Sequence, residues 1–233
     1  MMYSSIHIWG DSIARGILYD EKKKRYAIAA TRYTQLLQDT LGIAVHNHAV
    51  MGHTVRDGLN AFLAGSSAEN AICAIEYGGN DCDLDWAHLA AHPGEVPLPK
   101  VPLPLYRQQL RTFVEAVRAR TMQPLLVTPI PLHAQRYFHW VTKNLDATAI
   151  LSSLHDVFHI YRWQERYTIV MREIARETAC PLLDMRDAFL AAPNYESLIC
   201  IDGIHPNEKG HRLIADTALA AAKKIFRASS SHA

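Results

Sequence analysis

Short apolar runs alternate with longer amphipathic segments along the whole chain. The apolar runs are rich in aliphatic residues and carry almost no charge, so each predicts a buried strand. They occupy residues 6–9, 43–49, 71–77, 124–130 and 181–185. In the segments between them, hydrophobic residues recur at helical spacing. These segments predict helices at residues 31–41, 54–63, 106–121, 161–178, 186–192 and 207–226.

The ends of two helices carry residues that commonly cap them. Thr31 and Thr54 stand directly before helical patterns, so each hydroxyl is expected to accept a backbone N–H. Gly42 is expected to end the first of these helices. In the second helix the spacing turns four side chains toward the core, namely Val55, Leu59, Phe62 and Leu63.

The alternation of strands and helices predicts an α/β fold, in which a parallel sheet has helices on both faces. Right-handed crossover connections then place the carboxyl ends of all strands at one edge of the sheet. Residues 12–30 are expected to be irregular. Because no repeat or low-complexity linker divides the sequence, we expect one domain over residues 1–233.

Composition and charge exclude several classes of protein. Hydrophobic residues make up 49% of the chain, charged residues 20%, and the formal net charge is +1. This balance argues against nucleic acid or an anionic membrane as a partner. No apolar stretch reaches the roughly 18 residues that span a bilayer, and no signal-peptide pattern is visible. The four cysteines lack C-x-x-C spacing and are expected to be free thiols, so we expect a cytoplasmic protein.

Ser12 stands where the first apolar run breaks, in the stretch IHIWGDS. A serine at the carboxyl end of a strand faces the crevice in which open α/β sheets bind ligands. A nucleophilic serine also needs a base and a group that orients the base. Asp202 and His205 can supply both from one turn, because the carboxylate can face Nδ1 and leave Nε2 free to take the Ser12 proton. Taken alone, each pattern is equally typical of a turn or a helix cap.

Three groups can donate hydrogen bonds to an oxyanion beside Ser12. Asn80 follows a buried strand in the stretch GGND, and its side-chain amide is a donor. Gly52 can bring a backbone N–H close because it has no side chain. The backbone N–H of Ser12 is the third donor. Together with the Asp-x-x-His turn, these donors favour nucleophilic catalysis over ordinary turn chemistry.

The sequence resembles the SGNH (GDSL-type) hydrolase family. The matching stretches span Trp9 to His211 and are IWGDSIARG, the glycine of AVMGHT, GGND and DGIHPNEKGH. The resemblance implies a flavodoxin-like, three-layer α/β/α fold with a central parallel five-stranded sheet. It also implies a serine esterase that works through an acyl-enzyme, without a metal or cofactor. Its catalytic residues would be Ser12, Asp202 and His205, and its oxyanion hole would be Ser12, Gly52 and Asn80.

Two long insertions, residues 82–104 and 131–160, follow strands on the edge that carries Ser12. They carry aromatic residues that would not stay exposed without a partner surface. We therefore expect them either to form one cap over the active site or to serve as a homo-oligomer interface. The candidate pocket residues in and beside them are Asp11, Asp81, Trp86 and Trp140.

The insertions mix aromatic and polar side chains, which favours a short acyl group on a carbohydrate or another small polar alcohol. Two alternatives stay open within the hydrolases, an acyl thioesterase and a lysophospholipase. Either would need an apolar tunnel, for which Leu89, Val96, Leu98, Val101, Leu103 and Leu105 are candidates. A catalytically silent binding protein on the same fold is a third alternative, but it would not need Ser12, Asn80, Asp202 and His205 together.

Histidine pairs raise the question of a metal site. His155 and His159 have the i, i+4 spacing that binds zinc on a helix, but no third ligand follows in the sequence. His46 and His48 share one face of a strand and are expected to be structural or to lie on the surface. The sequence therefore predicts no metal.

Overall fold

The computed structural model describes residues 3–65 and 70–230 of the chain. Its centre is a five-stranded parallel sheet in the order β4-β1-β5-β6-β7. The strands are β1 (Ser5–Gly10), β4 (Ala44–Asn47), β5 (Ala71–Glu76), β6 (Gln123–Val127) and β7 (Leu182–Leu183). The order is that of the flavodoxin-like doubly wound sheet, which confirms the predicted fold class.

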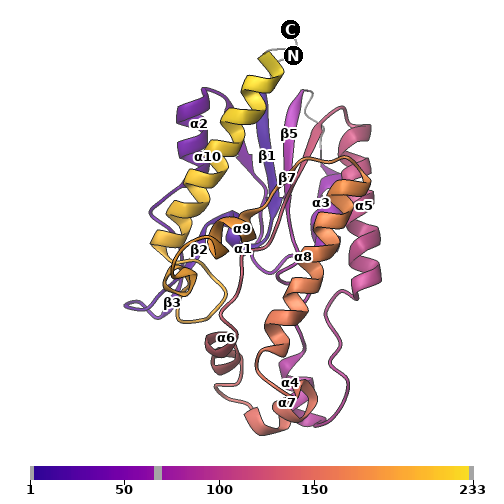
Figure 1. The fold of residues 1–233 in the computed structure, drawn as a ribbon, viewed down its shortest axis with the longest axis vertical. Coiled ribbons are helices and arrows are strands. Elements are labelled where there is room, and N and C mark those ends of the chain that lie inside the picture. Colours follow the sequence, from indigo (N-terminus) through magenta and orange to yellow (C-terminus); the bar gives the residue numbers. More distant parts are fainter. Residues whose placement is uncertain (1–2, 66–69, 231–233) are drawn as a thin grey trace.

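Helices cover both faces of the sheet, and a separate hydrophobic core fills each face (Figure 1). One face carries α3 (Val55–Ala64), α5 (Leu103–Ala119) and α8 (His159–Glu177). The other carries α2 (Tyr33–Leu41), α9 (Met185–Leu190) and α10 (Glu208–Ser230). All six residues of β5 are buried, because this strand has a neighbour on each side and helices on both faces.

The two insertions form short helices joined by loops. They contain α4 (Trp86–Ala91), α6 (Ala134–Val141) and α7 (Ala147–Leu154). These helices lie together at the end of the molecule opposite the termini (Figure 1). They share a small core of their own, to which both insertions contribute, built around Leu84, Leu89, Leu132, Tyr137, Ile150 and Leu154. A short 3₁₀ helix, η1 (Tyr195–Leu198), lies between α9 and α10.

The expectation that residues 12–30 are irregular is wrong. This segment forms α1 (Ser12–Arg15) and an antiparallel hairpin of β2 (Ile17–Asp20) and β3 (Arg25–Ile28). Gly16 ends α1 in the left-handed conformation, with φ of +86°. The lysine-rich residues between β2 and β3 make the hairpin turn. In this turn the Asp20 carboxylate accepts the backbone N–H groups of Lys22 and Lys23.

The ends of the helices agree only in part with the caps predicted from the sequence. Thr54 caps α3 in a reciprocal capping box with Asp57, and Gly42 ends α2, as predicted. Thr31 is not a cap, because α2 begins at Tyr33 and the backbone N–H of Thr31 donates to the Glu208 carboxylate. The inward placement of Leu63 is also wrong, since its side chain is 51% exposed. Within the described residues, every helix is too short or too polar to cross a bilayer.

Candidate active site

Ser12 is the first residue of α1, immediately after β1. The Asp11 side chain caps this helix by accepting the backbone N–H of Ile13. Gly10 permits the sharp turn, because a Cβ there would lie 2.6 Å from the Ala14 Cβ and 2.9 Å from a backbone oxygen of β5. The sequence therefore fixes Ser12 at the carboxyl end of a central strand.

His205 and Asp202 lie beside Ser12, although they are separated from it by most of the chain. His205 Nε2 is 2.8 Å from Ser12 Oγ, and His205 Nδ1 is 2.6 Å from Asp202 Oδ2. All three side chains are buried. The second Asp202 oxygen accepts the backbone N–H of His205, which holds the loop in place.

This geometry can activate a serine. A carboxylate that accepts the Nδ1 proton leaves Nε2 as the acceptor facing the hydroxyl, which is the arrangement needed for general-base removal of the serine proton. The loop has little freedom to move away, since a Cβ on Gly203 would lie 2.3 Å from the backbone nitrogen of Tyr137 in α6. His205 is therefore held beside Ser12 by packing as well as by hydrogen bonds.

Asn80 lies in the same pocket as Ser12 and its amide is held in a fixed orientation. Nδ2 donates to Asp11 Oδ2 at 3.2 Å and to the His53 carbonyl at 3.1 Å. Gly52 adopts a φ of +85° in the loop after β4, a conformation that suits glycine. Gly52 is not among the residues that line the pocket.

Asp11 does more than cap a helix. Its carboxyl is buried beside that of Glu76, the last residue of β5, and its backbone N–H lies 3.4 Å from Glu76 Oε2. Burial and the neighbouring Asp11 carboxyl raise the pKa of Glu76 well above its usual range. Burial also raises the pKa of Asp11. Asp11 therefore links the Glu76 carboxyl, through its backbone N–H, to the Asn80 amide on the pocket wall.

Two of the candidate pocket residues, Asp81 and Trp140, lie outside the pocket lining. Asp81 is fully buried and accepts the backbone N–H groups of Val55 and Gly78, so it braces the loop that carries Asn80. Burial raises the Asp81 pKa to about 7. Trp140 packs edge-on against Tyr19 of the hairpin, with ring centroids 4.7 Å apart. Neither side chain belongs to the pocket lining, because each is used in packing or in loop support.

The pocket over Ser12 has a volume of about 670 Å³, part of it open to solvent. Its wall includes Trp86 and Tyr137, one from each insertion, and Trp163 from α8. Asp83 holds two of these rings, since it accepts the indole N–H of Trp86 at 3.0 Å and the hydroxyl of Tyr137 at 2.5 Å. Trp86 and Tyr137 therefore present aromatic surfaces whose polar groups are already satisfied, whereas the buried indole N–H of Trp163 has no partner.

Sequence reasoning missed three residues near the site. Tyr26 of β3 stacks obliquely on His205, with ring centroids 5.0 Å apart, and burial raises its pKa to about 12. Gln164 lines the pocket, and its amide oxygen accepts from the backbone N–H of Leu132 and from Arg186. Glu76 is the third. None of these residues lies in a recognisable motif. Tyr26 reaches His205 only because residues 17–28 form the hairpin, which the sequence did not predict.

The predicted histidine pair of residues 155 and 159 does not share a helix. His155 follows the end of α7 with a φ of +66°, and His159 begins α8. His46 and His48 form a cluster with His7, in which His7 Nδ1 lies 3.0 Å from His48 Nε2 and Trp9 stacks on His48. In the described part of the chain, one group of side chains has metal-ligand spacing, namely His88, His92 and Glu95.

Comparisons with known proteins agree with this fold and motif order. The model of the GDSL-like lipase/acylhydrolase family matches residues 8–213. A lipase/acylhydrolase from Enterococcus faecalis superposes with a TM-score of 0.66 at 20% identity, over 94% of this chain and 95% of the other. No curated protein matches the sequence significantly.

Two further solved structures are similar. LAE5, an alpha/beta hydrolase enzyme from the metagenome of Lake Arreo, has a TM-score of 0.65 at 22% identity, with 95% and 96% of the two chains covered. A catalytic mutant of Axe2, an acetylxylan esterase from Geobacillus stearothermophilus, has a TM-score of 0.62 at 21% identity, with 94% of each chain covered. At these identities the likeness establishes the fold.

Proposed function

This chain belongs to the GDSL-like lipase/acylhydrolase family, and on that premise we propose that it is a serine ester hydrolase with Ser12 as its nucleophile. The observation that carries the proposal is the continuous hydrogen-bonded series of Ser12, His205 and Asp202, with contacts of 2.8 and 2.6 Å. All three side chains are buried, and Ser12 and His205 lie at a pocket wide enough for a small ester.

The reaction proceeds in two stages. His205 Nε2 takes the Ser12 proton while Oγ attacks the ester carbonyl, and the resulting imidazolium is stabilised by Asp202. His205 then protonates the departing alcohol, which leaves an acyl group on Ser12. In the second stage His205 activates a water molecule, and the carboxylic acid is released. The backbone N–H groups of Ser12 and Gly52 are assigned to the oxyanion hole, together with the Asn80 amide, which exchanges one of its two present acceptors for the oxyanion.

Replacing Asn80 by alanine is expected to lower kcat by about 10²- to 10³-fold with little change in KM. An oxyanion donor acts where charge develops, so its loss affects the transition state more than the bound substrate. Steady-state kinetics on a soluble aryl ester measure both constants. Asp81→Asn serves as a comparison, because it alters the same loop without removing the amide. An unchanged kcat with a raised KM would assign Asn80 to substrate binding instead.

We propose a short acyl group on a carbohydrate or another small polar alcohol as the substrate. The pocket wall presents Trp86, Tyr137 and Gln164, which suit the faces and hydroxyls of a sugar. The alternative apolar tunnel finds little support, because Val96 and Leu98 are 78% and 75% exposed and Leu89 is buried in the insertion core. The acetylxylan esterase among the structural neighbours is consistent with this choice.

A series of p-nitrophenyl esters tests both the reaction and the substrate class. We expect kcat/KM to be highest for acetate or butyrate and to fall toward octanoate. A site that accepts longer chains would gain about 0.8 kcal/mol, roughly fourfold, for each buried methylene. A rise toward long chains would favour the lysophospholipase or thioesterase alternatives. Absence of hydrolysis for every ester and thioester would favour a silent binding protein.

We propose one domain over residues 1–233, with the insertions at residues 82–104 and 131–160 acting as a cap over the active site. Their shared core and their contribution of Trp86 and Tyr137 to the pocket wall support this role. An interface between copies of the chain is the alternative role for the same surface. All four cysteines are unpaired, which supports a reducing, cytoplasmic location.

A further inference from the structure

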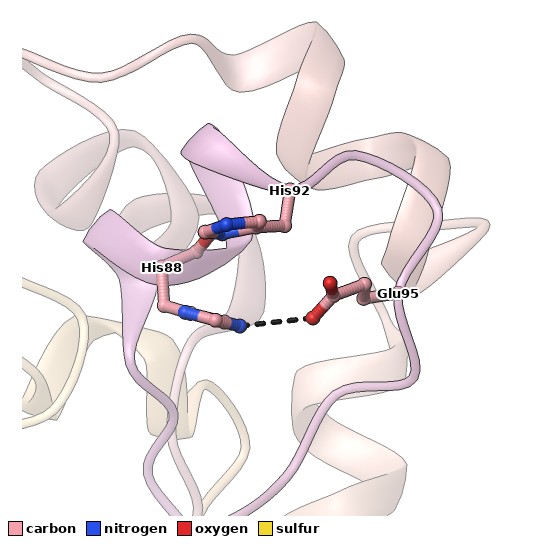
Figure 2. Close-up of side chains that lie close together, drawn as sticks. All are labelled: His88, His92 and Glu95. Carbon is pink, nitrogen blue, oxygen red and sulfur yellow. Dashed lines mark hydrogen bonds and ion pairs between the residues drawn. The ribbon is translucent and has the colours of Figure 1, made fainter.

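Three metal-ligating side chains converge on the outer surface of the first insertion, away from the pocket lining. His88 and His92 lie on and just after α4, and Glu95 follows in the next loop (Figure 2). One nitrogen or oxygen of each side chain lies within 4.8 Å of the other two. Figure 2 shows the carboxylate of Glu95 turned toward both histidines.

The helix places the two histidines together. Asp85 caps α4 by accepting the backbone N–H of His88, and Leu89 anchors the opposite side of the helix in the insertion core. His88 and His92 are four residues apart, so their rings stack one above the other with centroids 4.2 Å apart. Both side chains face solvent.

A tight turn returns the third ligand to the histidine pair. The backbone N–H of Glu95 donates to the carbonyl of His92 at 3.3 Å, across Pro93 and Gly94. Proline followed by a residue with positive φ, here Gly94 at +86°, is the signature of a type II turn. Ser153 of α7 accepts the backbone N–H of Gly94 at 3.0 Å and ties the turn to the second insertion. The chain direction at Glu95 is therefore fixed by the fold.

The tautomer of His92 suits a metal. Its Nδ1 lies 3.0 Å from the carbonyl oxygen of His88, which can only accept, so Nδ1 carries the proton. Nε2 then carries a free lone pair. In metalloproteins a backbone carbonyl often accepts the other ring N–H of a ligating histidine and orients the ring in the same way. His88 Nε2 lies 2.9 Å from Glu95 Oε2 and donates a hydrogen bond to it.

We propose that His88, His92 and Glu95 bind one divalent transition metal ion, with Zn²⁺ as the ion that fits best. Two imidazoles and a carboxylate are a typical zinc donor set, with water as the fourth ligand. Tetrahedral bonds of about 2.0–2.1 Å place ligand atoms roughly 3.3 Å apart. Small rotations of these exposed side chains bring the present spacing to that value, and the His88 ring proton moves from Nε2 to Nδ1 so that Nε2 can bind the ion.

The site does not take part in the proposed hydrolysis and stands independently of it. The ion would bond α4 to the loop that follows it, beside the contact of that loop with α7. Trp86 begins α4, so bound zinc would rigidify one wall of the pocket from outside. An exposed contact between His88 and Glu95 by itself contributes little to stability.

Calorimetric titration of the full chain with ZnCl₂ tests the site. We expect one equivalent to bind with higher affinity than any other, and His88→Gln, His92→Gln and Glu95→Gln each to weaken that event by at least about 10-fold. His139→Gln is the matched control, because it removes an exposed histidine of the second insertion without touching the cluster. Its titration should match that of the wild type.

Anomalous scattering at the zinc edge from a zinc-soaked crystal locates the ion directly. A peak bounded by His88, His92 and Glu95 is the expected result. A peak at the His7, His46 and His48 cluster alone would overturn the proposal, and so would one-equivalent binding that survives all three substitutions. Both experiments measure metal binding and not ester hydrolysis. Their results can therefore be interpreted even if the proposed esterase function is wrong.

Discussion

Replacing Ser12 by alanine is expected to lower kcat/KM for ester hydrolysis by about 10⁴- to 10⁶-fold. The substitution removes the only atom that can form the acyl-enzyme, whereas the pocket and His205 remain. Steady-state kinetics on p-nitrophenyl acetate measure the loss. A fluorophosphonate probe should label the wild type on the peptide that contains Ser12 and should leave the variant unlabelled.

The control for this prediction is Ser5→Ala, at the opposite end of the same strand. Ser5 is a buried serine at the start of β1 and takes no part in the pocket. Its variant should keep the activity and the labelling of the wild type. Urea unfolding should show that both variants are folded. Retention of most activity by folded Ser12→Ala would refute the assigned nucleophile.

The position of Ser12 could be predicted because it depends on local rules. An apolar run that breaks at Gly10 ends a strand, and the parallel sheet brings all such ends to one edge. Asp202 and His205 were predictable for a similar reason, since three residues of one turn decide their mutual geometry. The family resemblance then joined these two local patterns across the chain. The cap at Thr54 could be predicted for the same reason, because its capping box involves only the four residues from Thr54 to Asp57.

The surroundings of the site could not be predicted, because they depend on contacts between distant segments. In the sequence, Glu76 is only the last residue of an apolar strand. It lies beside Asp11 because β1 pairs with β5. Thr31 has the residue type of a cap, yet Glu208 from the far end of the chain binds its N–H. The helices of the insertions are short, and their apolar side chains pack against one another rather than against the sheet.

Arg186 is the clearest case of a residue that no sequence pattern identified. It lies near the start of α9 and is completely buried, with its Nε 2.6 Å from Glu165 Oε2. Its Nη1 donates to the Gln164 amide oxygen, and its guanidinium lies over the Tyr161 ring. A buried cation depends on such partners, since its desolvation is costly and one carboxylate must offset it. Arg186 therefore also fixes the amide of Gln164 on the pocket wall.

Glu165→Ala is expected to lower the free energy of unfolding by about 3–5 kcal/mol, because it leaves the Arg186 charge buried without its carboxylate. Urea unfolding of the purified variant measures the loss. The matched control is Glu173→Ala, on the same helix α8, whose partner Arg107 is 35% exposed and keeps a second ion pair with Glu177. The control should lose no more than about 1 kcal/mol.

A double variant separates the cost of a buried charge from the loss of packing. Arg186→Met removes the charge and keeps an apolar chain of similar length, so Glu165→Ala with Arg186→Met should be more stable than Glu165→Ala alone. The backbone N–H of Leu132 would still hold the Gln164 oxygen in the double variant. Glu165 also pairs with the partly exposed Arg172, which keeps Asp184 as a partner, so the buried Arg186 is what distinguishes Glu165 from Glu173. Equal losses for Glu165→Ala and Glu173→Ala would contradict the prediction.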